Sequence, residues 1–202
     1  MLRDFAGSRM LGAMRILVTG FNPFGKHRQN LTERLARESD GRRFGKSLVA
    51  GRVLPTEYRR CERALVRAMR ETRPEAVLLF GLAPGRKRLS LECVALNVDH
   101  SEKADNAGRR PWRRPIERRG PPLVEATLPV DRMHAALRRA RLPVSISYHA
   151  GTYVCNHAFY VAGRRARGAR VGFVHVPEKM SASRLRRALE VLVRSIGRGN
   201  SR

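Results

Sequence analysis

The sequence has few cysteines, and their arrangement excludes two common ways of stabilising a small domain. The chain of 202 residues contains three, Cys61, Cys93 and Cys155. The count is odd and no two of them form a C-x-x-C pair, so neither a disulfide framework nor a structural zinc site is expected. Free thiols are typical of a reducing compartment, and we therefore expect a cytoplasmic protein.

Long hydrophobic runs are also missing. No stretch approaches the roughly 20 apolar residues that a helix needs to cross a bilayer. The first 13 residues have no continuous apolar segment and carry Asp4, which argues against a signal peptide. Met14 directly precedes the first strand-like run, so we interpret residues 14–202 as one folded domain and residues 1–13 as a disordered extension.

Acidic residues are scarce: the chain has 17 Asp and Glu against 42 Lys and Arg, a formal net charge of +25. Such a basic excess often indicates a nucleic-acid or membrane-binding protein. Here the excess is spread along the whole chain, and nearly all of it is arginine, a preference that codon bias also produces. We therefore expect only weak, non-specific binding of nucleic acid and no membrane association.

The residues that are present predict a single α/β domain. Hydrophobic residues make up 42% of the chain, enough for one packed core. Short runs rich in β-branched residues alternate with helical spacing, which indicates a mostly parallel sheet covered by helices on both faces. The expected strands are 15–19, 47–54, 76–80, 126–130, 144–147 and 171–176, with a further extended segment at 89–98.

Helices are expected between these strands. Asn30 and Asp131 are placed where they would cap two of the helices. The spacing of apolar residues predicts helices over 57–72 and 183–196, and another begins within residues 151–162. Residues 100–122 are polar and rich in arginine and proline, which predicts a long loop of the kind that often carries function.

Three residues carry candidate chemistry. Cys155 follows a strand and a glycine and precedes a helical pattern, and a thiol at a helix N-terminus favours its thiolate form. His175 lies at the end of a predicted strand, where an imidazole can act as general base. Glu92 lies in an apolar extended segment and needs a partner, either an arginine such as Arg86 for structural reasons or His175 as its orienter. Taken singly, each is more often a structural residue.

Six segments together resemble one family. They are residues 20–25 (G-F-N-P-F-G), 81–86 (G-L-A-P-G-R), 92–97 (E-C-V-A-L-N), 105–106 (D-N), 150–157 (A-G-T-Y-V-C-N-H) and 172–177 (G-F-V-H-V-P). In this order and spacing the chain resembles pyroglutamyl peptidase type I over nearly its whole length. The resemblance implies a single α/β/α sandwich and a cysteine peptidase that removes an N-terminal pyroglutamyl residue from peptides. It also implies no metal or other cofactor and a homo-oligomer.

The resemblance assigns roles to individual residues. It implies Cys155 as nucleophile, His175 as general base and then acid, and Glu92 as the residue that orients His175. Phe21 and Phe24 resemble the aromatic residues that pack against the pyroglutamyl ring, and the alternative is that they anchor their loop to the core. Two further residues, Leu82 and Val154, fall in the substrate-binding part of the family pattern.

The sequence departs from the family at three positions near the expected site. Leu82 replaces a glutamine whose amide helps to bind the lactam in many members, and leucine can make no hydrogen bond. Cys93 replaces the arginine that usually follows the glutamate, and Glu102 replaces a cation. Two alternatives therefore accompany the peptidase prediction: a cysteine hydrolase of the same fold with altered acyl specificity, and a catalytically weak homologue that binds polyanions.

Overall fold

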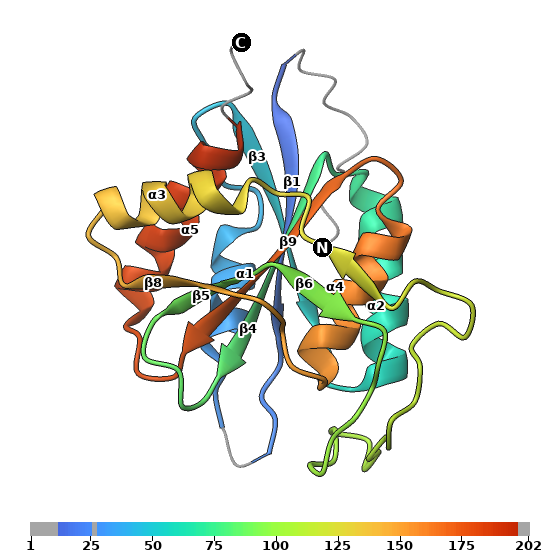
Figure 1. Ribbon diagram of the computed structural model, residues 1–202. Helices are drawn as coiled ribbons and strands as arrows, with labels where there is room; N and C mark the ends of the chain where they lie inside the picture. Colours follow the sequence, from blue (N-terminus) through green and yellow to red (C-terminus); the bar gives the residue numbers. More distant parts are fainter. Residues whose placement is uncertain (1–11, 26–27, 198–202) are drawn as a thin grey trace.

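The computed structural model describes residues 12–25 and 28–197 and builds a mixed sheet between two helical layers (Figure 1). The sheet has the strand order β2-β3-β1-β4-β9-β5-β8. Its strands are β1 (Met14–Phe21), β2 (Arg43–Phe44), β3 (Ser47–Leu54), β4 (Ala76–Ala83), β5 (Leu89–Glu92), β8 (Val144–Ser147) and β9 (Arg170–Pro177). The expectation for residues 1–13 falls mostly on positions 1–11, which lie outside the described residues.

Most of the strand pairs are parallel. Strands β3, β1, β4 and β9 run in the same direction, and β5 pairs with β9 antiparallel and with β8 parallel. A small second sheet joins β6 (Val94–Leu96) to β7 (Leu123–Glu125). Because parallel neighbours require crossover connections, helices lie on both faces of the sheet, and the predicted α/β/α architecture is confirmed.

Five helices form the two layers among the described residues: α1 (Leu31–Ser39), α2 (Tyr58–Thr72), α3 (Val130–Arg139), α4 (Val154–Arg165) and α5 (Ala182–Gly197). One hydrophobic cluster packs α1, α3 and α5 on one face, and a second packs α2 and α4 on the other. As predicted, Asn30 caps α1, because its side chain accepts a hydrogen bond from the backbone N–H of Thr32.

The strand predicted over residues 126–130 is wrong. Strand β7 ends at Glu125, and the backbone N–H groups of Thr127 and Leu128 both donate to the carbonyl of Val171 at the start of β9. The chain thus passes beside the first residues of β9 without pairing as a strand. The predicted helix cap is wrong as well, since α3 begins after Pro129 and Asp131 lies within its first turn.

The extended segment predicted over 89–98 is split between the two sheets. It changes from β5 to β6 at Cys93, whose N–H donates to the carbonyl of Ser147 and whose carbonyl accepts from Ala126. This break keeps Glu92 in the main sheet while the following residues lead into the long loop, which contains no helix or named strand between residues 100 and 122.

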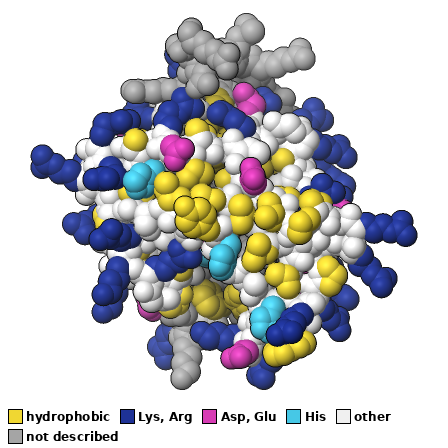
Figure 2. Space-filling view, viewed as in Figure 1, with side chains coloured by type: hydrophobic (Ala, Val, Ile, Leu, Met, Phe, Trp, Pro, Cys, Tyr) yellow, Lys and Arg dark blue, Asp and Glu magenta, His cyan; other side chains and the backbone are white. Residues whose placement is uncertain are grey.

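Lys and Arg side chains lie mostly around the outline of the face drawn in Figure 2. Figure 2 shows Lys and Arg side chains distributed around one face, with hydrophobic side chains gathered nearer its centre. This distribution agrees with the even spread of arginine along the sequence. No helix within the described residues is long and apolar enough to cross a membrane.

Candidate active site

The candidate site lies at the carboxyl ends of β1, β4 and β9, where α4 begins (Figure 1). This edge of a mostly parallel sheet is where α/β proteins bind ligands. Strand β9 contributes His175, the neighbouring β5 contributes Glu92, and the first turn of α4 contributes Cys155. The topology therefore brings together three side chains that come from distant parts of the sequence.

His175 and Glu92 form a buried pair. The Nδ1 atom of His175 lies 2.7 Å from Oε1 of Glu92, and their side chains are only 7% and 0% exposed. Glu92 pairs with Phe173 in the β5–β9 register, which places its carboxylate on the same face of the sheet as the imidazole. Since a carboxylate only accepts hydrogen bonds, Nδ1 carries the proton, and Nε2 keeps a free lone pair.

Arg86 contacts the same carboxylate oxygen. Its guanidinium nitrogen lies 3.1 Å from Oε1 of Glu92, and its side chain is 33% exposed. The two partners that the sequence offered Glu92 as alternatives are therefore both present. The other oxygen, Oε2, is buried and has no hydrogen-bond partner among the described residues. The arginine offsets a buried negative charge that would otherwise be costly.

The thiol of Cys155 lies against the backbone of Gly81. A Cβ atom placed on Gly81 would lie only 2.7 Å from Sγ of Cys155, so this glycine makes room for the thiol. Gly81 and His175 are partners in the β4–β9 register, and adjacent strands lie about 4.8 Å apart. The thiol and the imidazole therefore lie side by side on the same face of the sheet.

Burial shifts the pKa values of Cys155 and His175 in opposite directions. Burial and the charge of Glu92 raise the pKa of Cys155 to about 12, against the opposing effects of Arg86 and a backbone hydrogen bond. Burial also lowers the pKa of His175, and the bond to Glu92 only partly offsets it. The backbone hydrogen bond at the start of α4 lowers the pKa of Cys155, in the direction expected for a thiol at a helix N-terminus, but burial outweighs this effect.

The residues expected to contact substrate fall into two groups. Phe21 and Val154 are buried in the hydrophobic cluster that packs α2 and α4 against the sheet. Phe24 is only partly buried, and its ring centroid lies 6.2 Å from that of Tyr153, two residues before Cys155. The two phenylalanines thus lie on the side of the sheet that carries the thiol, and the Phe21 ring also anchors its loop to the core.

Leu82 has a different orientation. It follows Gly81 on β4, and successive side chains on a strand point to opposite faces. Phe80, two residues earlier, belongs to the cluster on the α1, α3 and α5 face, as does Val176, which pairs with Leu82. The alternation therefore directs the Leu82 side chain away from Cys155, while its backbone remains beside the site.

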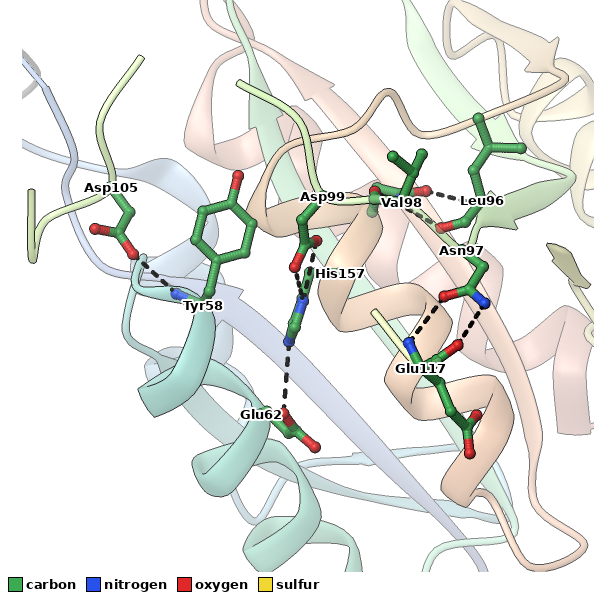
Figure 3. A network of polar contacts seen from close by, with 10 residues as sticks. Tyr58, Glu62, Leu96, Asn97, Val98, Asp99, Asp105, Glu117 and His157 are labelled. Carbon is green, nitrogen blue, oxygen red and sulfur yellow. Dashed lines mark hydrogen bonds and ion pairs between the residues drawn. The ribbon is translucent and has the colours of Figure 1, made fainter. Parts of the chain in front are cut away.

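A polar network that the sequence did not predict ties the long loop to α4 and to the start of α2 (Figure 3). The carboxylate of Asp99 lies 2.9 Å from Nδ1 of the buried His157. Asp105 accepts a hydrogen bond from the backbone N–H of Tyr58 at 3.1 Å. The signal that could have indicated the first pair is the histidine two residues after Cys155, although nothing in the sequence pointed to its partner 58 residues away.

The network continues at the far end of the loop. The Asn97 side chain accepts from the N–H of Glu117 and donates to its carbonyl, as Figure 3 shows. The Asn156 side chain bonds the backbone of Leu96 and Val98. Within the described residues, no group of three or more His, Cys, Asp or Glu side chains is placed to hold a metal ion.

Comparison with known proteins gives consistent matches. The profile of the family described as pyroglutamyl peptidase matches residues 14–185. A pyrrolidone-carboxylate peptidase of Chromobacterium violaceum is 40% identical over 162 residues, which cover 80% of this chain and 77% of the relative. One of Thermococcus onnurineus is 37% identical over 193 residues, covering 90% and 94%. The solved pyrrolidone carboxyl peptidase of Thermococcus litoralis has a TM-score of 0.86 and 32% identity, covering 91% of this chain and 93% of that one.

Proposed function

Because the chain belongs to the pyroglutamyl peptidase family, we propose that it hydrolyses the bond after an N-terminal pyroglutamyl residue, with Cys155 as the nucleophile. The observation that carries this proposal is the buried His175–Glu92 contact of 2.7 Å on the face of the sheet where Cys155 packs over Gly81. A nucleophile, a base and a group that orients the base are the parts that covalent acyl transfer requires.

The acylation step follows from this arrangement. Nε2 of His175 takes the proton of the Cys155 thiol as Sγ forms a bond to the acyl carbonyl carbon. Glu92 stabilises the imidazolium that results, since its carboxylate accepts from Nδ1. The unpaired N–H groups in the first turn of α4 are suited to hold the oxyanion. When the tetrahedral intermediate collapses, the imidazolium gives its proton to the leaving amine and a thioester remains.

Hydrolysis of the thioester reverses the same proton path. Water attacks the thioester carbonyl and gives its proton to His175, which then returns it to the departing sulfur of Cys155. Pyroglutamate is released and the neutral pair is restored. The raised pKa of Cys155 and the lowered pKa of His175 agree with a site that moves the proton only during the reaction.

The acyl pocket is proposed to lie beside Phe21 and Phe24, whose rings suit the apolar faces of a small lactam. Leu82 and Val154 flank Gly81 and Cys155, and we assign them backbone contacts rather than side-chain contacts with the ring. Since the Leu82 side chain is directed to the other face, the loss of a glutamine there gives no reason to expect a different acyl group.

A fluorogenic pyroglutamyl amide tests this function directly. The purified protein should release the fluorophore from the pyroglutamyl amide and not from the matched prolyl amide, which lacks the lactam carbonyl. Cys155→Ala should abolish turnover, whereas Cys61→Ala and Cys93→Ala should retain it, since neither thiol belongs to the triad. A metal chelator should have no effect. Retained turnover in Cys155→Ala would contradict the proposal.

The setting of the enzyme is also proposed. Three free thiols, one of them the proposed nucleophile, suit the reducing environment of the cytoplasm. The resemblance to a family of oligomeric enzymes supports a homo-oligomer, which light scattering of the purified protein would test. Any binding of nucleic acid should be weak and should weaken further as salt increases.

A further inference from the structure

A strongly basic segment lies in the long loop. We call residues 109–119 the arginine segment. It carries Trp112, the only tryptophan of the chain, with its side chain 64% exposed. Its six arginines are all exposed: Arg109, Arg110, Arg113, Arg114, Arg118 and Arg119. The guanidinium carbon of Arg113 lies 5.7 Å from the centre of the Trp112 ring.

The charge of the arginine segment is not neutralised by the protein. None of its six arginines forms an ion pair with a carboxylate among the described residues. Two acidic side chains close to the segment have other partners. Glu117 pairs with Arg164, and Asp105 accepts from backbone N–H groups, including that of Arg109. Glu102 remains exposed at the start of the loop. The segment therefore presents a net positive surface.

The arginine segment is held in place at several points. Asp99 and Arg114 exchange two backbone hydrogen bonds, and the N–H of Ser101 donates to the carbonyl of Pro111. The Asn97 side chain holds the backbone of Glu117, and Asp99 is itself fixed to His157 in α4 (Figure 3). A preformed surface loses little conformational entropy on binding a ligand.

The same loop borders the proposed nucleophile. His100 exchanges two hydrogen bonds with Thr152, three residues before Cys155, and its ring lies 4.6 Å from that of Trp112. The hydroxyl of Tyr153 donates to the carbonyl of Ala104.

The loop also reaches the proposed acyl pocket. The side chain of Asn106 donates to the carbonyl of Pro23, next to Phe24. The loop thus connects the turn that precedes Cys155 with the segment that carries Phe24, beside the proposed acyl pocket.

We propose that the arginine segment binds the acidic part of the peptide that follows the scissile bond, so that the enzyme prefers pyroglutamyl peptides with Asp or Glu downstream. This inference rests on the proposed function and adds a substrate class to it. Guanidinium groups bind carboxylates with two parallel hydrogen bonds, and the exposed ring of Trp112 offers apolar contact beside them. An oligonucleotide could use the same groups, but the contacts of the loop with the residues before Cys155 and with the Phe24 segment favour a substrate peptide.

Two peptides of equal length and shape test the selectivity. The acidic peptide is pyroglutamyl-Ala-Asp-Glu-Glu amide, and the neutral one is pyroglutamyl-Ala-Asn-Gln-Gln amide. At low salt, kcat/KM for the acidic peptide should exceed that for the neutral one by about fivefold, as expected for a few exposed ion pairs. The ratio should fall toward one as the ionic strength rises above about 0.15 M.

Two double variants test whether the arginine segment causes the preference for the acidic peptide. Arg110→Gln combined with Arg113→Gln should bring the acidic-to-neutral ratio close to one. Arg184→Gln combined with Arg187→Gln makes the same change in net charge on α5, in the other helical layer, and should keep the preference. A ratio that is one in the unaltered enzyme, or that falls equally in both double variants, would overturn the proposal.

A binding measurement separates this inference from the proposed function. Because Trp112 is the only tryptophan, its fluorescence in the Cys155→Ala variant reports peptide binding without turnover. The acidic peptide should change this signal at a concentration about fivefold lower than the neutral one, even if neither is cleaved by the unaltered enzyme. Equal titrations would contradict the inference, and so would a response to a single-stranded oligonucleotide but not to the acidic peptide.

Discussion

Gly81 and Cys155 pack so closely that no residue larger than glycine fits at position 81. A Cβ atom on Gly81 would lie 2.7 Å from the Cys155 sulfur and equally close to the ring of Phe173. The glycine is also the register partner of His175. The absence of a side chain at this one position therefore allows the thiol to lie over the sheet, beside the imidazole that is proposed to take its proton.

Gly81→Ala should consequently displace the thiol. We expect kcat/KM to fall about a hundredfold, since an error of roughly 1 Å in a reacting group has that effect. Overpacking should lower the free energy of unfolding by about 1–3 kcal/mol. Gly172→Ala is the matched control, because its Cβ would meet Leu128 on the opposite face. Steady-state kinetics and urea unfolding should show a stability loss in both variants and an activity loss in Gly81→Ala alone.

Glu92→Gln should slow the reaction and shift its pH dependence downward. The bond and charge of Glu92 raise the pKa of His175 against the effect of burial, so their loss should lower that pKa further. Activity requires neutral His175 and is lost as the pH falls through its pKa. The acid limb of kcat/KM should therefore move to lower pH, while kcat falls by on the order of 10³–10⁴. An upward shift would be inconsistent with the assigned role.

Arg86→Gln should shift the same limb in the opposite direction. The positive charge of Arg86 lowers the pKa of both His175 and Cys155. Its removal should raise the His175 pKa, so that activity is lost at a higher pH than in the unaltered enzyme. The pH profiles of Glu92→Gln and Arg86→Gln, recorded in the same buffers, should bracket that of the unaltered enzyme. Shifts of the same sign would show that Arg86 acts on the fold rather than on the carboxylate.

The Asp99–His157 pair should stabilise the long loop. Asp99→Ala leaves Nδ1 of a buried imidazole unpaired, which should lower the free energy of unfolding by about 1–3 kcal/mol. In a His157→Leu background the same change should cost less, because no unpaired nitrogen remains. Urea unfolding of the four proteins gives the coupling energy, and Trp112 fluorescence reports whether the loop moves. Equal costs in both backgrounds would mean that the contact contributes nothing specific.

Much of this fold could be predicted because its signals are local. The cap at Asn30 and strand β3 depend on neighbouring residues, and the structure reproduces both. The segment over 126–130 has an equally strand-like composition, but its prediction as a strand is wrong. Residues 127 and 128 instead donate hydrogen bonds to Val171 near the start of β9, and sequence patterns do not reveal such a contact.

The residues of the site could be predicted from the sequence better than their pKa values. The motifs indicated Cys155, His175 and Glu92, and the fold brings them to one edge of the sheet. The raised pKa of Cys155 could not be predicted, because the burial that causes it arises only from packing against Gly81 and β9. The orientation of the Leu82 side chain could not be predicted either. The expected strand ends at residue 80, whereas β4 continues to Ala83, so that Leu82 follows the alternation of the strand.

Trapping the acyl-enzyme tests the central claim most directly. Unaltered protein is mixed with a pyroglutamyl fluorogenic amide, quenched in acid within the first turnover and examined by peptide mass spectrometry. We expect one pyroglutamyl group in thioester linkage on the peptide that carries Cys155, together with a burst of fluorophore equal to the enzyme concentration. Turnover without any adduct on Cys155, or an adduct on Cys61 or Cys93 instead, would contradict it.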